Sequence, residues 1–167
     1  MKKIVAIIFT LLFVGFVVLT IVRYFQFDIG CSQHLKRAAD ASSVETAKIE
    51  IEQAISYAEK HNLTEGIVSL FLKQPKNDVS FWYNNMVSAY EELEDLPEDS
   101  TPLERTNVLM KIRESLTDQK GNDVTVTVPD NLYLYPYNKI HFWGGIALFV
   151  LMVGSWLYCS LKRKTVL

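Results

Sequence analysis

Two long apolar runs lie near the ends of the chain, and polar residues are concentrated between them. Ile4 to Val22 is nineteen residues without a charged side chain, and Ile140 to Leu161 is twenty-two. With a helical rise of about 1.5 Å per residue, each run can cross the roughly 30 Å hydrocarbon core of a bilayer. The pattern predicts a mainly α protein, a two-pass transmembrane hairpin whose spans enclose a domain at 23–139.

Charged residues close to the runs predict how this hairpin is oriented. All nineteen Asp and Glu fall between the two runs, so the short ends 1–3 and 162–167 carry only basic charge. Basic residues next to a span favour the cytoplasmic side. We therefore expect both ends in the cytoplasm and 23–139 outside it. The charges expected to set this topology are Lys2, Lys3, Lys162, Arg163 and Lys164.

Aromatic residues gather at the ends of both runs, where rings with one polar end favour the membrane–water boundary. One group follows the first run and precedes the second, and the other lies near the end of the second run. They predict eight interface anchors. The outer ones are Tyr24, Phe25, Tyr135, Tyr137, Phe142 and Trp143, and the inner ones are Trp156 and Tyr158.

The first run could instead be a cleaved signal peptide. Signal peptides have a shorter apolar region of 7–15 residues and a small-residue cleavage site. Here Arg23 follows nineteen uncharged residues, and bulky aromatics come next. Asp28 stands where a lipid-modification motif ending at Cys31 would need an aliphatic residue. The composition favours an uncleaved anchor.

The intervening segment predicts a bundle of three to four helices. Ser42 and Glu45 fit a capping box ahead of apolar positions at helical spacing, and His61–Asn62 is expected to end that helix. Further helices are expected from Asp78 to Leu96 and from Thr101 to about Gly121. A shorter helix is expected at 33–41, with a bend or break near 40–43.

Two stretches do not have a helical pattern. Residues 124–128 alternate and are β-branched or apolar, which predicts a strand, and 129–131 predicts a turn before 132–135. A short β-hairpin just before the second span is therefore plausible. The apolar stretch 66–72 suits either an extended, buried segment or an extra helical turn.

Few residues in the sequence suggest catalysis, a metal or a cofactor. Cys31 and His34 have a spacing that some metal sites use, but no second ligand pair follows. The acidic run 91–95 lacks the spacing of a calcium loop. No nucleotide or hydrolase motif occurs, and the basic residues of the domain are dispersed, so no cofactor and no nucleic-acid partner is expected. Cys31 is either a free thiol or one half of an intermolecular bridge.

These observations favour a non-enzymatic protein of a bacterial inner membrane, whose partners are the lipid bilayer and a membrane protein or a second copy. It would act as an accessory or scaffold subunit through its outer domain and its spans. The alternative is a module that senses a small ligand and signals laterally. Its layout of span, helical bundle and span resembles the extracytoplasmic halves of bacterial chemoreceptors and sensor kinases, without a shared motif.

Overall fold

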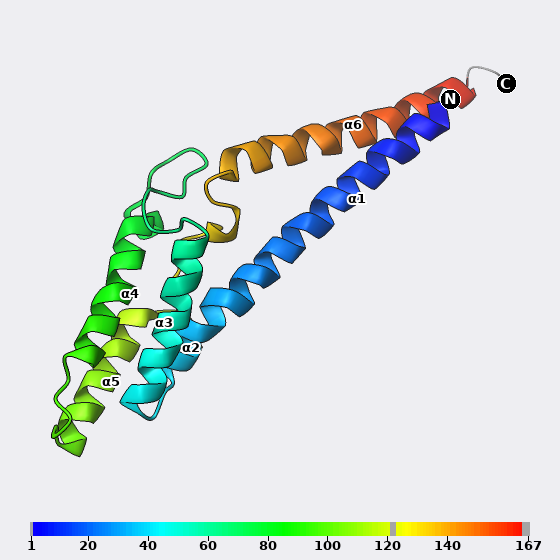
Figure 1. Cartoon of the computed structure of the whole chain (residues 1–167). Coiled ribbons are helices and arrows are strands. Elements are labelled where there is room, and N and C mark those ends of the chain that lie inside the picture. Colours follow the sequence, from blue (N-terminus) through cyan, green and yellow to red (C-terminus); the bar gives the residue numbers. More distant parts are fainter. Residues whose placement is uncertain (1, 121–122, 165–167) are drawn as a thin grey trace.

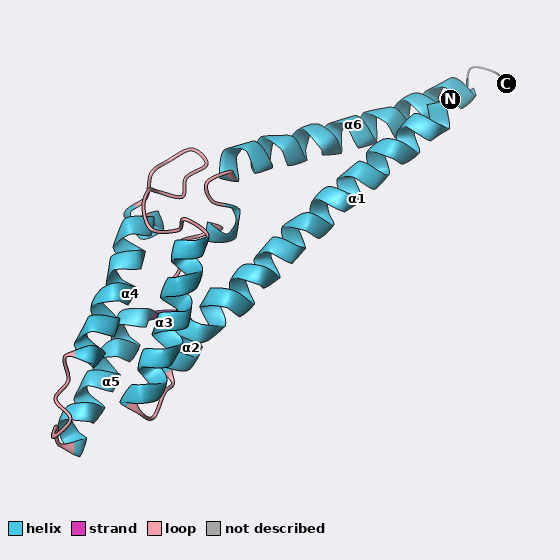
Figure 2. Cartoon of the chain, viewed as in Figure 1, coloured by secondary structure: helices cyan, strands magenta, loops and turns pink. Residues whose placement is uncertain are grey.

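The computed structural model describes residues 2–120 and 123–164, and for Lys2, Lys120 and 162–164 it describes the backbone alone. The side chains of the expected topology-setting charges, except that of Lys3, therefore lie outside the described part. The chain is mainly helical (Figure 2). Its α-helices are α1 (Lys2–Phe27), α2 (Gln33–Ala39), α3 (Val44–Lys60), α4 (Val79–Glu94), α5 (Pro102–Leu116) and α6 (Asn138–Lys164).

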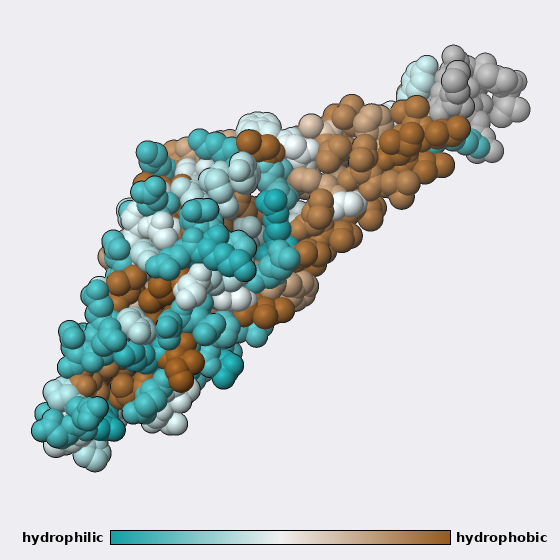
Figure 3. All heavy atoms as spheres, viewed as in Figure 1, coloured by the Kyte–Doolittle hydropathy of each residue, from teal (hydrophilic) through white to brown (hydrophobic). Residues whose placement is uncertain are grey.

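Two helical segments are long and apolar enough to cross a membrane, Lys3–Ala39 and Asn138–Leu161. Figure 1 shows α1 and α6 projecting from one end of the remaining helices, with both chain termini at the far tip. On the face shown in Figure 3, hydrophobic side chains cover most of this projection, whereas hydrophilic ones prevail over the other helices. Such a continuous apolar surface is typical of a lipid-facing helix pair. We call α1 and α6 the span helices and residues 27–135 the domain.

The first span helix does not end at the domain boundary. A π-helical turn, Asp28–Ser32, joins α1 directly to α2, so that the chain is helical from Lys3 to Ala39. The helix predicted at 33–41 is therefore not separate from the first span helix but continues it. No proline interrupts this stretch, and Gly30 lies against the ring of Tyr57, where a Cβ atom would clash.

Helix α3 begins one residue later than the capping motif predicts. The side chain of Ser43 accepts a hydrogen bond from the backbone N–H of Thr46 at 3.1 Å, so Ser43 is the N-cap, and the capping box of Ser42 with Glu45 is wrong. The predicted break at 40–43 is confirmed, as is the end of this helix at His61. The capping box at the start of α5 is present, with Thr101 and Glu104 bonded reciprocally.

Helices α2, α3, α4 and α5 pack around one apolar core. Ile51 on α3 and Met86 on α4 are completely buried in this core. The 3₁₀ turn Leu132–Leu134 closes this core with Leu132. The largest fully buried side chains among the described residues are Leu35, Ile51, Met86, Ile112, Leu132, Val79 and Cys31.

The β-hairpin exists, but it uses a different partner strand. Strand β1 (Thr117–Lys120) pairs antiparallel with β2 (Asp123–Val126), and Thr117 lies opposite Val126. The expected second strand at 132–135 is wrong, because Leu132 enters the core from a 3₁₀ turn after Asn131, which has a φ of 59°. Helix α5 ends at Leu116 and Thr117–Lys120 form a strand, so the expected continuation of this helix to about Gly121 is wrong. Gly121 itself lies outside the described residues.

The loop between α3 and α4 matches the expectation of an extended, buried segment at 66–72 only at its base. Ile67 forms an isolated bridge with Asp78, and Val68 is buried, so the base of the loop is extended and packed. Its tip is not buried: Phe71 is 69% exposed and Leu72 is 77% exposed. Figure 1 shows this loop beside the start of α6.

Replacing Gly66 by alanine is expected to destabilise the domain by about 1–3 kcal/mol. Gly66 has a φ of 101°, which disfavours any side chain, and an added Cβ would clash with the hydroxyl of Tyr135. Urea-dependent proteolysis of the purified full chain measures the loss. Gly144→Ala is the control, because no atom lies within 4 Å of its added Cβ. Equal stability of the two variants would contradict the role of Gly66.

Candidate functional site

The domain meets the span helices in a region that we call the junction. It consists of the end of α1 near Tyr24, the loop 66–77, the segment 130–138 and the first turns of α6. Tyr24 packs edge-on against Tyr133, with ring centroids 5.5 Å apart. The junction joins the domain to both span helices at once, and it is the best candidate for a functional region.

The span helices are held together by polar contacts near both ends. Nε2 of His141 lies 3.0 Å from Oγ1 of Thr20, and the indole N–H of Trp156 donates to Oγ1 of Thr10 at 3.0 Å. Between them, Gly145 lies against the ring of Phe16. Hydrogen bonds between membrane helices contribute about 0.6–2 kcal/mol each. Gly145 therefore lets α6 approach α1 closely at this point.

The contact between His141 and Thr20 is accompanied by further contacts. Oγ1 of Thr20 lies within hydrogen-bond distance both of the carbonyl oxygen of Phe16, at 2.9 Å, and of Nε2 of His141, at 3.0 Å. The ring of His141 also lies 4.3 Å from that of Phe16, measured between centroids. His141 therefore links α6 to α1 at the junction.

Tyr135 and Trp156 are among the expected interface anchors that also form hydrogen bonds within the protein. The hydroxyl of Tyr135 donates to the carbonyl oxygen of Glu65 at 3.0 Å, which ties the junction to the base of the loop. Trp156 bonds to Thr10, as described above. Membrane placement of all eight remains a prediction. The remaining six all have substantial exposed surface: Tyr24, Phe25, Tyr137, Phe142, Trp143 and Tyr158.

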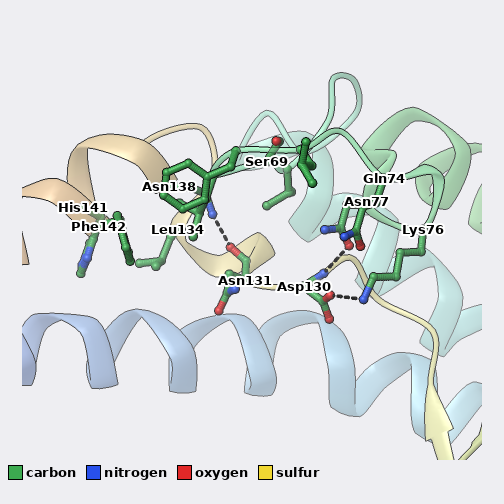
Figure 4. A pocket seen from close by; sticks show the side chains of 14 residues that line it. Ser69, Gln74, Lys76, Asn77, Asp130, Asn131, Leu134, Asn138, His141 and Phe142 are labelled. Atoms are coloured by element: carbon green, nitrogen blue, oxygen red, sulfur yellow. Dashed lines mark hydrogen bonds and ion pairs between the residues drawn. The ribbon is translucent and has the colours of Figure 1, made fainter.

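A cavity of about 520 Å³ lies at the junction, between the loop and the start of α6 (Figure 4). At one end Lys76 forms an ion pair with Asp130 at 2.6 Å, and the backbone N–H of Asp130 donates to the side chain of Asn77. In the middle the amide of Asn138 donates to the carbonyl oxygen of Asn131 at 2.8 Å. The polar groups of this cavity thus bond mainly to one another.

A second cavity of about 480 Å³ lies between α4, the end of α5 and the segment 127–130. Phe81, Trp82 and Met86 contribute its apolar wall, and Asp118 and Asp130 contribute carboxylates. Cavities that bind small molecules have this size and this mixture of an apolar wall with a few polar groups. Trp82 is only 5% exposed, so it belongs to the core and also lines this cavity.

The one charged side chain buried among the described residues is that of Glu50, on α3. Its carboxylate lies 2.6 Å from Nδ1 of His34 and 2.6 Å from the guanidinium of Arg37, both on α2. Burying a carboxylate is costly unless it is paired. These contacts therefore attach α3 to the continuation of the first span helix. His34 therefore contacts Glu50 and does not form a metal site with Cys31.

Cys31 is completely buried against α3, and its sulfur lies 4.0 Å from the carbonyl oxygen of Ala54. This position argues for the free thiol over an intermolecular bridge in the folded protein. Burial raises the pKa of the Cys31 thiol to about 12. Since only the thiolate reacts, Cys31 is also chemically protected.

In a Cys159→Ser chain at pH 8, Cys31 is expected to resist maleimide until the protein is denatured. The raised pKa leaves a thiolate fraction of about one in ten thousand, and burial blocks the reagent. Mass spectrometry before and after denaturation measures the labelling. A cysteine added at the exposed Leu103 is the positive control. Rapid labelling of native Cys31, or a reducible dimer, would contradict its burial.

The most prominent feature that the sequence did not predict is the exposed pair Phe71 and Leu72. The ring of Phe71 lies 5.6 Å from that of Phe142 and 6.4 Å from that of Trp143, between centroids. The available signal was a mostly apolar run between Gly66 and Lys73, followed by the polar stretch 73–76. The sequence shows no partner for that run, because the contact spans about seventy residues.

Within the described residues, no group of three or more His, Cys, Asp or Glu side chains is placed to hold a metal ion. Comparison with protein-family models, with curated proteins and with solved structures yields no match for this chain. Arguments about function therefore depend on the chain's own geometry.

Proposed function

We propose that this chain is a two-pass accessory or scaffold subunit of a bacterial inner membrane, with both termini in the cytoplasm. Its outer domain and span helices would dock onto a larger membrane protein, and the chain itself would catalyse no reaction. The supporting observation is the helix that runs unbroken from Lys3 to Ala39. It begins in the proposed span and ends among buried residues of the domain.

A continuous helix gives the domain a defined position relative to the membrane. Phe27, Cys31 and Leu35 lie on this helix and belong to the domain core. The second span helix is tied to the first through His141 and Trp156, so the domain and both span helices form one connected unit. A rigid connection of this kind suits a subunit that must present one face to a neighbouring protein. A flexible linker would not fix the orientation of that face.

Candidate docking positions on the domain are exposed apolar side chains away from the junction. They include Leu103 and Met110 on α5, which are 70% and 55% exposed. Photoreactive residues at these two positions, in the full chain expressed in intact cells, should form a discrete adduct with another membrane protein. Inserting Gly-Gly between Val22 and Arg23 should weaken that adduct, because it interrupts the helix before the domain core. Adducts only with lipid, or adducts that the insertion leaves unchanged, would contradict the proposal.

The second candidate function is sensing of a small ligand, and the cavity beside Trp82 favours it. A ligand that binds only the folded protein raises its melting temperature. Thermal unfolding of the full chain in nanodiscs, with a panel of amino acids, sugars and aromatic metabolites, tests this function. Phe81 lines the cavity and is 64% exposed, so Phe81→Ala should reduce any shift without unfolding the core. No shift with any compound would favour the accessory role.

A further inference from the structure

We propose that the tip of the loop between α3 and α4, Phe71 and Leu72, inserts into the bilayer leaflet that faces the domain. The loop would thus form a third membrane contact, in addition to the two span helices. The lipid partner is the boundary between the headgroups and the acyl chains. This inference rests on α1 and α6 crossing the membrane, as proposed above.

The depth of the tip follows from its contacts with α6. The apolar run of α6 begins at Ile140, and the ring of Phe71 packs against Phe142 and Trp143. With a rise of about 1.5 Å per residue, these two rings lie about 3–5 Å inside the start of that run. A side chain in contact with them lies at the same level. Phe71 is therefore placed at the edge of the hydrocarbon once α6 crosses the bilayer.

The exposure of the tip points to lipid as its occupant. Phe71 and Leu72 are adjacent, large, apolar and more than two thirds exposed, although the base of the same loop is packed into the domain. At this depth, lipid fills any space beside a span that protein does not occupy. Lys73 follows the tip, and Lys139 precedes the second span. Lysines at such positions extend toward headgroups while their stems remain in apolar surroundings.

The loop is also held in position for this contact. The backbone N–H of Val68 donates to the carbonyl of Asn77 at 2.9 Å, and that of Val79 donates to the carbonyl of Gly66 at 2.9 Å. Tyr135 bonds to Glu65 at the adjoining residue. These bonds fix both sides of the base, so the tip is presented at one level and little ordering is needed when lipid binds.

The test places the environment-sensitive fluorophore NBD on single cysteines of the full chain, in nanodiscs of phosphatidylethanolamine and phosphatidylglycerol. Cys159→Ser removes the one native thiol that is not fully buried. The chain with this substitution alone measures any background labelling of Cys31. The probe sites are Leu72→Cys in the tip, Val150→Cys in α6 and Leu103→Cys far from the junction, all at exposed positions. Lipids brominated near the headgroup, or deeper in the acyl chains, serve as quenchers.

The probe at position 72 should emit at shorter wavelength than the probe at 103, and shallow bromines should quench it several-fold more strongly. The probe at 150 should be quenched best by the deeper bromines. If the probe at 150 is quenched and the probe at 72 is not, the loop inference is wrong. The proposed membrane crossing of α6 is then still supported. If 72 emits at short wavelength without bromine quenching, a second copy or another protein covers the tip, which also overturns the inference. If 150 is not quenched, the proposed membrane topology itself fails.

Discussion

Leu35→Ala is expected to destabilise the domain by about 2–5 kcal/mol, the range for removing a fully buried leucine side chain. Leu35 has no exposed surface, although it lies on the same continuous helix as the proposed first span. The cavity would open between α2 and α3, where the helix enters the core. A loss of this size is a large part of the stability of a domain of about one hundred residues.

Leu103→Ala is the matched control, because the same side chain is 70% exposed on α5. Its effect should lie within about 0.5 kcal/mol of zero. Urea-dependent proteolysis of both variants in nanodiscs compares them while the span helices stay in lipid. Equal losses at the two positions would show that Leu35 is not part of the core, and that the first span helix ends before the domain.

Removing both partners of Glu50 is expected to cost about 3–5 kcal/mol, because it leaves an uncompensated buried carboxylate. His34→Ala with Arg37→Ala is the variant that does this, since both side chains contact the Glu50 carboxylate at 2.6 Å. Glu50→Gln should cost less, because the neutral amide is easier to bury and the two bases remain partly hydrated. A larger loss of stability in the double variant than in Glu50→Gln would therefore show that the charge of Glu50 is buried.

The control is Glu92→Gln, which removes the exposed ion pair with Lys111 at 2.7 Å. Pairs of this kind contribute about 0–1 kcal/mol. All three variants can be compared by the same proteolysis assay. If the double variant were no less stable than Glu92→Gln, the link between α2 and α3 through Glu50 would carry no stability, and the rigid connection proposed for the domain would lose part of its support.

The sequence predicted the features that depend on local patterns. The span helices follow from run length, and α4 and α5 follow from apolar spacing together with Asp78 and the capping box at Thr101. The break between α2 and α3 follows from a change of helical phase near Asp40. In each case the information lies within one or two turns of helix. Contacts across the fold can therefore modify such a feature only at its ends.

The features that were predicted wrongly depend on distant contacts. Residues 132–135 alternate like a strand, but Leu132 is needed in the core and Tyr135 bonds to Glu65, so this segment forms a 3₁₀ turn. Polar residues after Leu116 pair with β2 although their pattern is weak. The continuation of α1 into α2 was missed because aromatic residues after Arg23 suggested an interface, and a helix can carry them equally well.

The candidate site was the least predictable part. The eight aromatic anchors were identified from their position next to the apolar runs, but the contacts of Tyr135 and Trp156 within the protein required the fold. The loop tip at Phe71 could not be assigned, because its neighbours Phe142 and Trp143 are distant in sequence. Glu50 was not singled out, since one glutamate among several on α3 has no local mark of burial.

The most direct test of the central claim is the labelling of single cysteines in intact cells by a membrane-impermeant maleimide, in a Cys159→Ser chain. The claim is that a two-pass hairpin holds the domain on one side of the membrane and both ends on the other. Gln53→Cys, at an exposed position of α3, should be labelled in intact cells, and Thr165→Cys in the C-terminal end should be labelled only after permeabilisation. Labelling of Thr165→Cys in intact cells, or of Gln53→Cys only after permeabilisation, would contradict this topology.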